Sequence, residues 1–270
     1  MRTGPEIASF MYHEVTDDPR ESGFQRPGAR PYALSRDAFT RHLDQIQDGP
    51  MAPELVTGID LTRGGRHLLL TFDDGGRSAV YAGNQLAARG WRGHFFVVTA
   101  RIGEPTFLDP GQIRYLASCG HLIGSHSHSH PDIFRDLPPG RMAEQWRVSR
   151  DILEQLLGRA CPAASVPGGD ISAEVLASAD AVGLGFLFTS EPWLVPRRTG
   201  PCWALGRFTV RGSTTPATVR SLCRFRGWRR AQLTRHLKVA ASRMLPPLYR
   251  LYVRWTTRVH SGSRAGALRA

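Results

Sequence analysis

The stretch His67-Leu-Leu-Leu-Thr-Phe-Asp-Asp-Gly-Gly76 decides which fold the chain is expected to adopt. Its apolar run is typical of a buried strand and stops abruptly at Asp73 and Asp74. Two glycines follow, so the backbone can turn sharply just past the acids. In parallel α/β sheets and barrels, ligands and catalytic groups collect at the carboxyl ends of strands. By itself the stretch also fits a strand followed by a solvated Asp-Asp-Gly turn, so other segments must distinguish the two.

Segments typical of strands alternate with segments typical of helices from residue 7 to residue 210. The expected strands are 7–12, 68–72, 93–99, 121–126, 161–166, 185–190 and 203–210. The expected helices are 35–46, 78–89, 111–118, 141–157 and 172–181. Such alternation predicts a parallel α/β sheet or barrel, here with about seven strands.

Basic residues are concentrated at the C-terminal end of the chain. The net charge is +12, yet no acidic residue follows Glu191, and the last 79 residues carry 17 lysines and arginines. We therefore expect a barrel domain at 1–214 and a basic amphipathic helical extension at 215–270. Within the extension, 217–260 is expected to form two helices broken at Pro246-Pro247, followed by a frayed tail.

Three interpretations of the basic extension remain open. It packs on the barrel with a solvated basic face, or it lies on an anionic membrane surface with its apolar side buried through 217–260. Nucleic-acid binding is compatible with the charge, but no motif for reading bases is present. No nucleic-acid partner is therefore expected.

Cysteine usage and targeting signals indicate a reducing compartment by default. The four cysteines are far apart and form no CxxC pair, so free thiols are expected. The N-terminus lacks a basic stretch followed by an apolar signal region, and no run reaches the ~18 apolar residues of a membrane span. The expected location is the cytoplasm, and peripheral association with the cytoplasmic face of the membrane is the alternative.

A second informative stretch is Gly124-Ser-His-Ser-His-Ser-His-Pro131. His126 and His130 are four residues apart, a spacing that puts both imidazoles on one side of a helical turn. Together with one carboxylate from another strand end, Asp73 or Asp74, they would form a metal site with open positions. His128 is expected to point away from it. The competing interpretation is a polar loop of solvated histidines.

Two motifs in the right order carry a resemblance to a known family. Thr71-Phe-Asp-Asp-Gly75 and His126-Ser-His-Ser-His130 resemble the first two motifs of the polysaccharide deacetylases, the NodB-type carbohydrate esterases of family 4. The resemblance implies a distorted (β/α)7 barrel and one divalent metal ion, usually zinc. The metal would be held by Asp74, His126 and His130, and Asp73 would be the general base.

The implied chemistry suits these residue types. A divalent metal polarises an acetyl carbonyl and acidifies water, and a neighbouring carboxylate takes the proton during attack. Ser127 stands at a family Ser/Thr position and is expected to orient the metal ligands.

The chain departs from the family at its third and fourth motifs. Where the family has an Arg and a Pro-Pro-Tyr-Gly run, this chain has Ser165-Val-Pro-Gly-Gly169, so Ser165 holds the arginine position and Pro167 and Gly169 would line the site. Arg207 is the candidate replacement for the arginine. In place of the fourth motif stands Thr189-Ser-Glu-Pro-Trp193, which makes Glu191 and Trp193 candidate pocket residues, although a capping Glu and a core Trp fit equally well.

The general acid is expected at the N-terminus. The family's late Leu-x-His is missing here, but Met11-Tyr-His-Glu-Val15 resembles the first strand of a circularly permuted branch that includes poly-N-acetylglucosamine deacetylases. That resemblance assigns the acid to His13, whose ordinary pKa lies near neutrality. The competing interpretation is a structural histidine at a strand end.

The predicted function is a metal-dependent hydrolase that removes an N-acetyl group from an amino sugar of a polysaccharide or lipid-linked glycan. A carbohydrate is therefore the expected partner. The alternative is a catalytically weakened barrel that binds glycan or membrane within a polysaccharide-assembly system. A third hypothesis keeps the chemistry but changes the bond, to a formyl group or a small amide.

Overall fold

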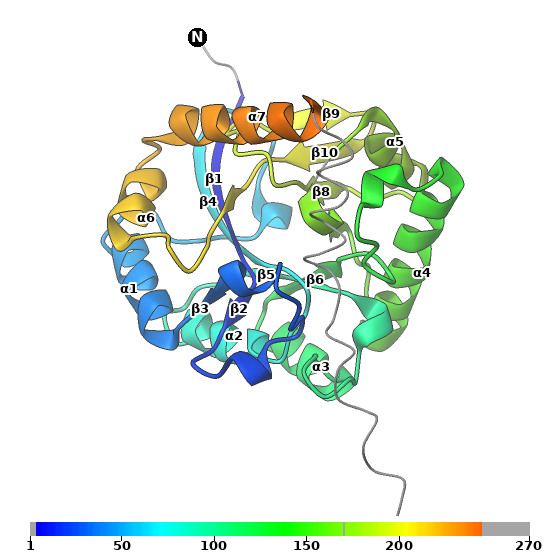
Figure 1. Cartoon of the computed structure of the whole chain (residues 1–270), viewed down its shortest axis with the longest axis horizontal. Helices are drawn as coiled ribbons and strands as arrows, with labels where there is room; N and C mark the ends of the chain where they lie inside the picture. The colour runs from blue at the N-terminus through cyan, green and yellow to red at the C-terminus, as the bar shows by residue number, and fades with distance from the viewer. Residues whose placement is uncertain (1–3, 170, 245–270) are drawn as a thin grey trace, which may run out of the picture.

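One curled sheet of nine strands runs through the molecule, with helices around its outside (Figure 1). The computed structural model describes residues 4–169 and 171–244, without the side chains of 238–244. The strands of this sheet are β1 (Glu6–Tyr12), β4 (Arg66–Phe72), β5 (His94–Val97), β6 (Leu122–Ser125), β7 (Ala163–Ser165), β8 (Phe186–Phe188), β9 (Arg197–Thr199), β10 (Cys202–Leu205) and β11 (Phe208–Thr209). Two further short strands, β2 (Glu14–Val15) and β3 (Ala33–Leu34), pair with each other.

The strands follow the order β11-β1-β4-β5-β6-β7-β8-β10-β9. All neighbours are parallel except β9 and β10, which form an antiparallel pair at one edge. The sheet curls into an open barrel whose edges are β11 and β9. The prediction of an α/β fold with a distorted barrel is confirmed.

The last predicted strand, 203–210, is wrong in detail because it is split into β10 and β11. Between them the Arg207 N–H donates to the Glu191 carbonyl at 2.9 Å, so the chain leaves the ladder of β10. A Cβ atom on Gly206 would lie 2.3 Å from the Trp193 ring, so only glycine fits this bend. The split, with β9, gives eight parallel strands and one antiparallel strand rather than about seven.

Seven helices are found in the described residues. They are α1 (Arg36–Gln47), α2 (Ala79–Ala87), α3 (Pro110–Ser118), α4 (Pro139–Leu157), α5 (Ala173–Ala181), α6 (Pro216–Cys223) and α7 (Trp228–Met244). The five helices predicted within the barrel are confirmed to within two residues at each end. Their boundaries follow from local chemistry: the Ser35 hydroxyl accepts from the Ala38 N–H at 3.2 Å at the start of α1, and Gly158 takes φ 64° to end α4.

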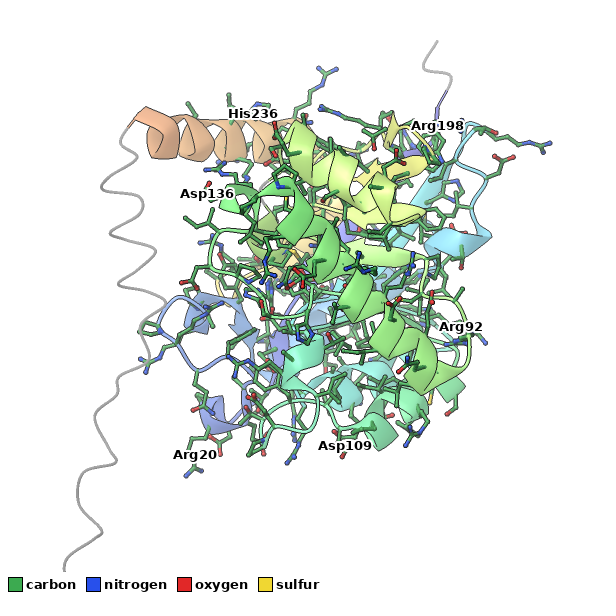
Figure 2. The ribbon with its side chains drawn as sticks, turned by 90° about the vertical axis from the view of Figure 1, so that its right-hand side faces the viewer. Arg20, Arg92, Asp109, Asp136, Arg198 and His236 are labelled. Carbon is green, nitrogen blue, oxygen red and sulfur yellow. The ribbon has the colours of Figure 1, made fainter. Side chains whose placement is uncertain are left out.

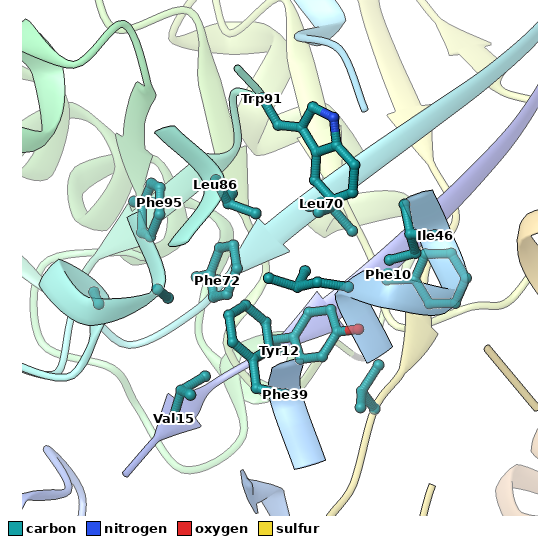
Figure 3. Close-up of a cluster of buried hydrophobic side chains, with 14 of the residues drawn as sticks. Phe10, Tyr12, Val15, Phe39, Ile46, Leu70, Phe72, Leu86, Trp91 and Phe95 are labelled. Atoms are coloured by element: carbon teal, nitrogen blue, oxygen red, sulfur yellow. The ribbon is translucent and has the colours of Figure 1, made fainter. Parts of the chain in front are cut away.

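The pairing of β1 with β4 sets the positions of the residues that follow both strands. Tyr12 pairs with Phe72 in parallel register, and the Asp73 N–H donates to the Tyr12 carbonyl at 3.0 Å. The Phe72 ring stacks on both Tyr12 and Phe95, with centroids 5.5 and 4.7 Å apart (Figure 3). This buried stack holds the register, so His13 and Asp73 emerge side by side at the carboxyl edge of the sheet.

Part of the predicted C-terminal extension contributes to the core of the barrel. Helix α6 packs against α1, and Trp228 at the start of α7 is only 3% exposed. Its ring meets Phe10 edge-on with centroids 6.2 Å apart, and its indole N–H donates to the Leu222 carbonyl at 3.0 Å. The two helices separate around Gly227, whose φ is 84°. The predicted break at Pro246-Pro247 and the predicted tail lie outside the described residues.

Two composition-based expectations can be compared with the structure. Cys119, Cys161, Cys202 and Cys223 are all free, as predicted. Among the helices that the structure describes, none combines the length and apolarity that crossing a membrane requires.

Replacing Trp228 by Ala should destabilise the whole domain by about 3–5 kcal/mol, because it removes a large buried ring from the barrel core. Arg229→Ala, an exposed change at the next position, should stay within about 0.5 kcal/mol. Urea unfolding followed by circular dichroism measures both. An equal, small effect of the two changes would mean that α6 and α7 are an independent extension.

Candidate active site

Six polar side chains gather at the carboxyl edge of the sheet, each brought there by the end of a strand. Asp73 and Asp74 follow β4, His126 follows β6, and Ser165 ends β7. His13 follows β1, and Arg207 lies in the bend between β10 and β11. The parallel strands explain this convergence, because their carboxyl ends all lie on one side of the barrel.

Asp73 is buried and held by Arg207. The guanidinium donates to both carboxylate oxygens, at 2.7 and 2.9 Å, and the Ser165 hydroxyl donates to the same carboxylate at 2.9 Å. The remaining donors of Arg207 reach Thr71, Ser165 and the Thr189 carbonyl at 2.7–3.0 Å. Arg207 thus takes the contact that the family's third-motif arginine would make, from a different strand, and Ser165 adds a hydrogen bond.

This arrangement keeps Asp73 ionised. Burial raises the pKa of a carboxyl group, but the adjacent Arg207 guanidinium and His126 outweigh it, so the pKa of Asp73 lies below its ordinary value. Arg207 itself is fully buried, and its charge is balanced by this carboxylate. Each of the two buried charges therefore has an opposite charge beside it, which offsets the cost of removing it from water.

Asp74, His126 and His130 form a compact three-residue cluster. The Nε2 atoms of His126 and His130 lie 3.3 and 3.6 Å from Asp74 Oδ1, and ligand atoms of all three lie within 4.8 Å of one another. His126 Nδ1 donates to the Ser165 carbonyl at 2.9 Å, and this contact fixes the ring with Nε2 facing Asp74. Two imidazole nitrogens and one carboxylate oxygen are a donor set that fits zinc.

Burial and the neighbouring charges shift the pKa values of all three residues of the cluster. Burial raises the pKa of Asp74, but hydrogen bonding to His126 and the nearby His13 lower it well below its ordinary range. Burial lowers the pKa of His130 to about 3. His126 is different: burial lowers its pKa, but the carboxylates of Asp73 and Asp74 more than reverse this. The cluster therefore presents an ionised carboxylate and one neutral imidazole.

The predicted helical turn over 126–130 is wrong. The segment is an irregular loop with left-handed backbone at Ser127 (φ 63°) and His130 (φ 51°). The Ser127 hydroxyl accepts from the His130 N–H at 3.1 Å, and this local bond offers the backbone an alternative to a helix. The two imidazoles still face each other, 5.1 Å between ring centroids. His128 instead contacts the Thr99 hydroxyl at 3.0 Å, away from the cluster.

His13 lines the same cavity. The cavity has a volume of about 180 Å³ and is also lined by Asp73, Asp74, His126 and His130. The His13 ring lies 4.7 Å from the Tyr32 ring, and its Nδ1 atom is buried without a hydrogen-bond partner among the described residues. Burial lowers the pKa of His13, while the charges of Asp74 and Asp73 act in the opposite direction.

Of the other predicted pocket residues, some line the cavity and some do not. Gly169 lines the cavity, whereas Pro167 is buried beside it. Glu191 pairs with Arg235 at 3.0 Å, and the buried Trp193 ring lies under Arg197 at 3.8 Å. Neither Glu191 nor Trp193 lines the cavity, although the partner of Glu191, Arg235, does.

Sequence reasoning missed several residues that line the cavity, among them Glu14, Arg26 and Tyr32. Glu14 accepts hydrogen bonds from the Ser78 hydroxyl and the Gly23 N–H, and burial raises its pKa to about 7. Arg26 approaches His130 Nδ1 at 3.2 Å and Asp132 at 3.1 Å. Arg26 and Tyr32 come from the segment between β2 and β3, where the sequence offers no motif that would mark them as site residues. For Glu14, its position directly after His13 was the available signal.

Comparison with known proteins agrees with this geometry. Residues 60–187 match the profile of the family described as polysaccharide deacetylase. Over this segment the chain is similar to the polysaccharide deacetylases. A curated relative, YxkH of Bacillus subtilis (strain 168), is named after the same family and is 25% identical over 217 residues, which cover 76% of this chain and 71% of YxkH.

Solved polysaccharide deacetylases share the fold. A polysaccharide deacetylase from Bacillus cereus superposes with a TM-score of 0.70 at 17% identity, over 82% of this chain and 69% of that one. IcaB from Ammonifex degensii gives a TM-score of 0.66 at 23% identity, over 82% and 98% of the two chains. Streptococcus pyogenes PplD gives 0.66 at 19% identity, over 80% and 97%.

Replacing Arg207 by Met should destabilise the barrel domain by about 3–5 kcal/mol at pH 7, because it leaves the Asp73 charge buried and unpaired. Without Arg207, burial raises the pKa of Asp73, so the variant relieves this penalty by taking up a proton as the pH falls. The stability gap between wild type and variant should therefore narrow from pH 7 towards pH 5 in urea unfolding.

Arg77→Met, a change at an exposed arginine, serves as the control and should cost less than about 0.5 kcal/mol at every pH. A gap for Arg207→Met that stays constant with pH would contradict the assignment of Asp73 as the charge that Arg207 balances.

Proposed function

We propose that this protein is a metal-dependent polysaccharide deacetylase that hydrolyses the N-acetyl group of an amino sugar in a carbohydrate. One observation carries the proposal. A three-residue metal-ligand cluster, an ionised carboxylate held by Arg207, and a histidine with an unpartnered nitrogen all line one cavity. Each of these groups has a separate role in hydrolysing an amide.

Asp74, His126 and His130 would hold the divalent metal, for which zinc is our candidate. When bound, the ion polarises the acetyl carbonyl and makes water more acidic. A guanidinium only donates, so His130 Nδ1 accepts from Arg26 in the present state. Ligation through Nε2 requires the proton on Nδ1, so Arg26 would release His130 and keep its contact with Asp132.

Asp73 would be the general base. Its carboxylate is kept ionised by Arg207, lies 3.9 Å from His126 Nε2, and so sits directly beside the ligand cluster. The two-point contact with Arg207 fixes the plane of the carboxylate, and a positioned base is what general-base catalysis requires. This contact supports catalysis over the alternative of a weakened binding barrel, which the arginine missing at position 165 had motivated.

His13 would be the general acid that protonates the leaving amine. Its Nδ1 atom is unpartnered, and its ring is fixed between the Tyr32 ring and the cavity. Burial lowers the pKa of His13, and the neighbouring carboxylates of Asp74 and Asp73 offset this effect only in part. For the substrate class we rely on the family, and the PplD structure was determined in complex with acetate, the product that a deacetylase releases.

Asp74→Asn and His126→Ala should each abolish zinc retention and lower deacetylation by at least about 10³-fold, because two ligands hold the ion too weakly. Zinc content by mass spectrometry and acetate release from an acetylated chitooligosaccharide measure the two effects. His67→Ala, at the far end of β4, is the matched histidine control and should change neither. Unchanged zinc content and activity in the first two variants would refute the proposed function.

His13→Gln should keep the zinc content of the wild type but lower kcat by about 10²–10⁴-fold, the usual range for loss of a general acid. The defect should shrink for an acetyl ester whose leaving group needs no proton, such as 4-nitrophenyl acetate. An equal loss with both substrates would assign His13 a structural role instead.

A further inference from the structure

A second cavity continues from the active-site cavity. It has a volume of about 640 Å³ and lies between β11 and the helices α6 and α7. Four residues line both cavities: Ser190, Thr209, Arg211 and Arg235. The two spaces are therefore adjoining parts of one depression, and we call the larger part the arginine groove. In Figure 2, α7 with its labelled His236 lies along the upper edge of the molecule.

The arginine groove is strongly positive. Arg211, Arg226, Arg230 and Arg235 line it, and among the residues that the structure describes no Asp or Glu does so. The chain as a whole has no acidic residue after Glu191, so α6, α7 and the loop between them contribute no carboxylate. Unscreened guanidinium groups that share a concave surface raise the local concentration of anions.

An ion pair with a described residue balances only one of these charges, at the end of the groove near the active site. There Arg235 pairs with Glu191 at 3.0 Å, and Arg211 contacts the Tyr32 hydroxyl at 3.3 Å. At the other end, Arg226 and Arg230 are exposed and make no ion pair with any described residue. A ligand that reaches outward from the active site would therefore meet two uncompensated guanidinium groups.

The remaining walls are partly polar and partly apolar. Thr218, Ser221 and Thr234 provide hydroxyl groups, while Phe208 and Leu222 are apolar. Arginine with hydroxyl donors suits phosphate oxygens, because the planar guanidinium binds them in pairs. A neutral glycan chain would gain nothing from uncompensated guanidinium groups, and one sugar carboxylate would use only one of them.

We propose that the arginine groove binds the diphosphate of a glycosyl diphosphate whose N-acetyl group occupies the active-site cavity. This inference rests on the proposed deacetylase function and narrows its substrate to a sugar still attached to a diphosphate carrier. Two carriers share that chemistry: a nucleotide and a polyprenyl lipid. Leu233 and Leu237 of α7 are 61% and 64% exposed, and they give the lipid carrier an apolar surface beside Arg230.

The test compares three acetylated substrates: uridine diphosphate N-acetylglucosamine, a polyprenyl diphosphate N-acetylglucosamine in detergent micelles, and a neutral chitooligosaccharide. The variant is Arg226→Gln combined with Arg230→Gln. The control is Arg229→Gln, which changes an exposed arginine of the same helix that does not line the groove. Steady-state acetate release gives KM and kcat for each substrate.

The double variant should raise KM for the diphosphate substrates by about tenfold or more, with KM for the neutral oligosaccharide and all values of the control unchanged. The carrier with the lower wild-type KM identifies the source of the diphosphate. An unchanged KM for both diphosphates, or an equal rise for all three substrates, would overturn the inference.

Calorimetric binding of inorganic pyrophosphate separates this inference from the proposed function. Binding to the wild type that is lost in the double variant and kept in Arg229→Gln supports the groove, even if no substrate is deacetylated and the proposed function fails. Absence of pyrophosphate binding to the wild type would overturn the groove, whatever the activity on the oligosaccharide.

Discussion

The buried pair of Asp73 and Arg207 is the interaction on which the rest of the site depends. The open barrel has no hydrogen-bonded ladder between β10 and β11, and Arg207 stands in the bend between them. Its side chain reaches Thr71 and Asp73 on the β4 side and the Thr189 carbonyl after β8. The Arg207 side chain therefore connects strand ends across the barrel, and its positive charge stabilises the buried Asp73 carboxylate.

This pair also gives two adjacent carboxylates different environments. Asp73 is directed into a guanidinium and a serine hydroxyl, whereas left-handed backbone at Asp74 (φ 75°) turns the next carboxylate towards His126 and His130. Neighbouring residues of an extended strand point to opposite faces, and the turn lets both contribute to one cavity instead. A solvated Asp-Asp-Gly turn is excluded by the burial of both side chains.

The basic C-terminal part is connected to this site rather than separate from it. Trp228 anchors the start of α7 in the core, and Arg235 of the same helix lines the active-site cavity. Basic residues that the sequence concentrates in its C-terminal part thus line the arginine groove, next to the carboxyl edge of the sheet. The packing of α6 and the start of α7 on the barrel explains the apolar residues of this part, and Arg230 and Arg235 of α7 line the groove.

The sequence by itself determined the alternation of strands and helices, the strand-end position of Asp73 and Asp74, and the pairing of His126 with His130, because these depend on patterns within a few residues. Only the tertiary structure decided that Arg207 binds Asp73, 134 positions away in the sequence. It also decided that 126–130 is an irregular loop, with left-handed backbone at Ser127 and His130, rather than a helical turn. It further decided that Glu191 and Trp193 do not line the cavity. Such contacts depend on how separate strand ends meet around the barrel, and no local pattern in the chain records that geometry.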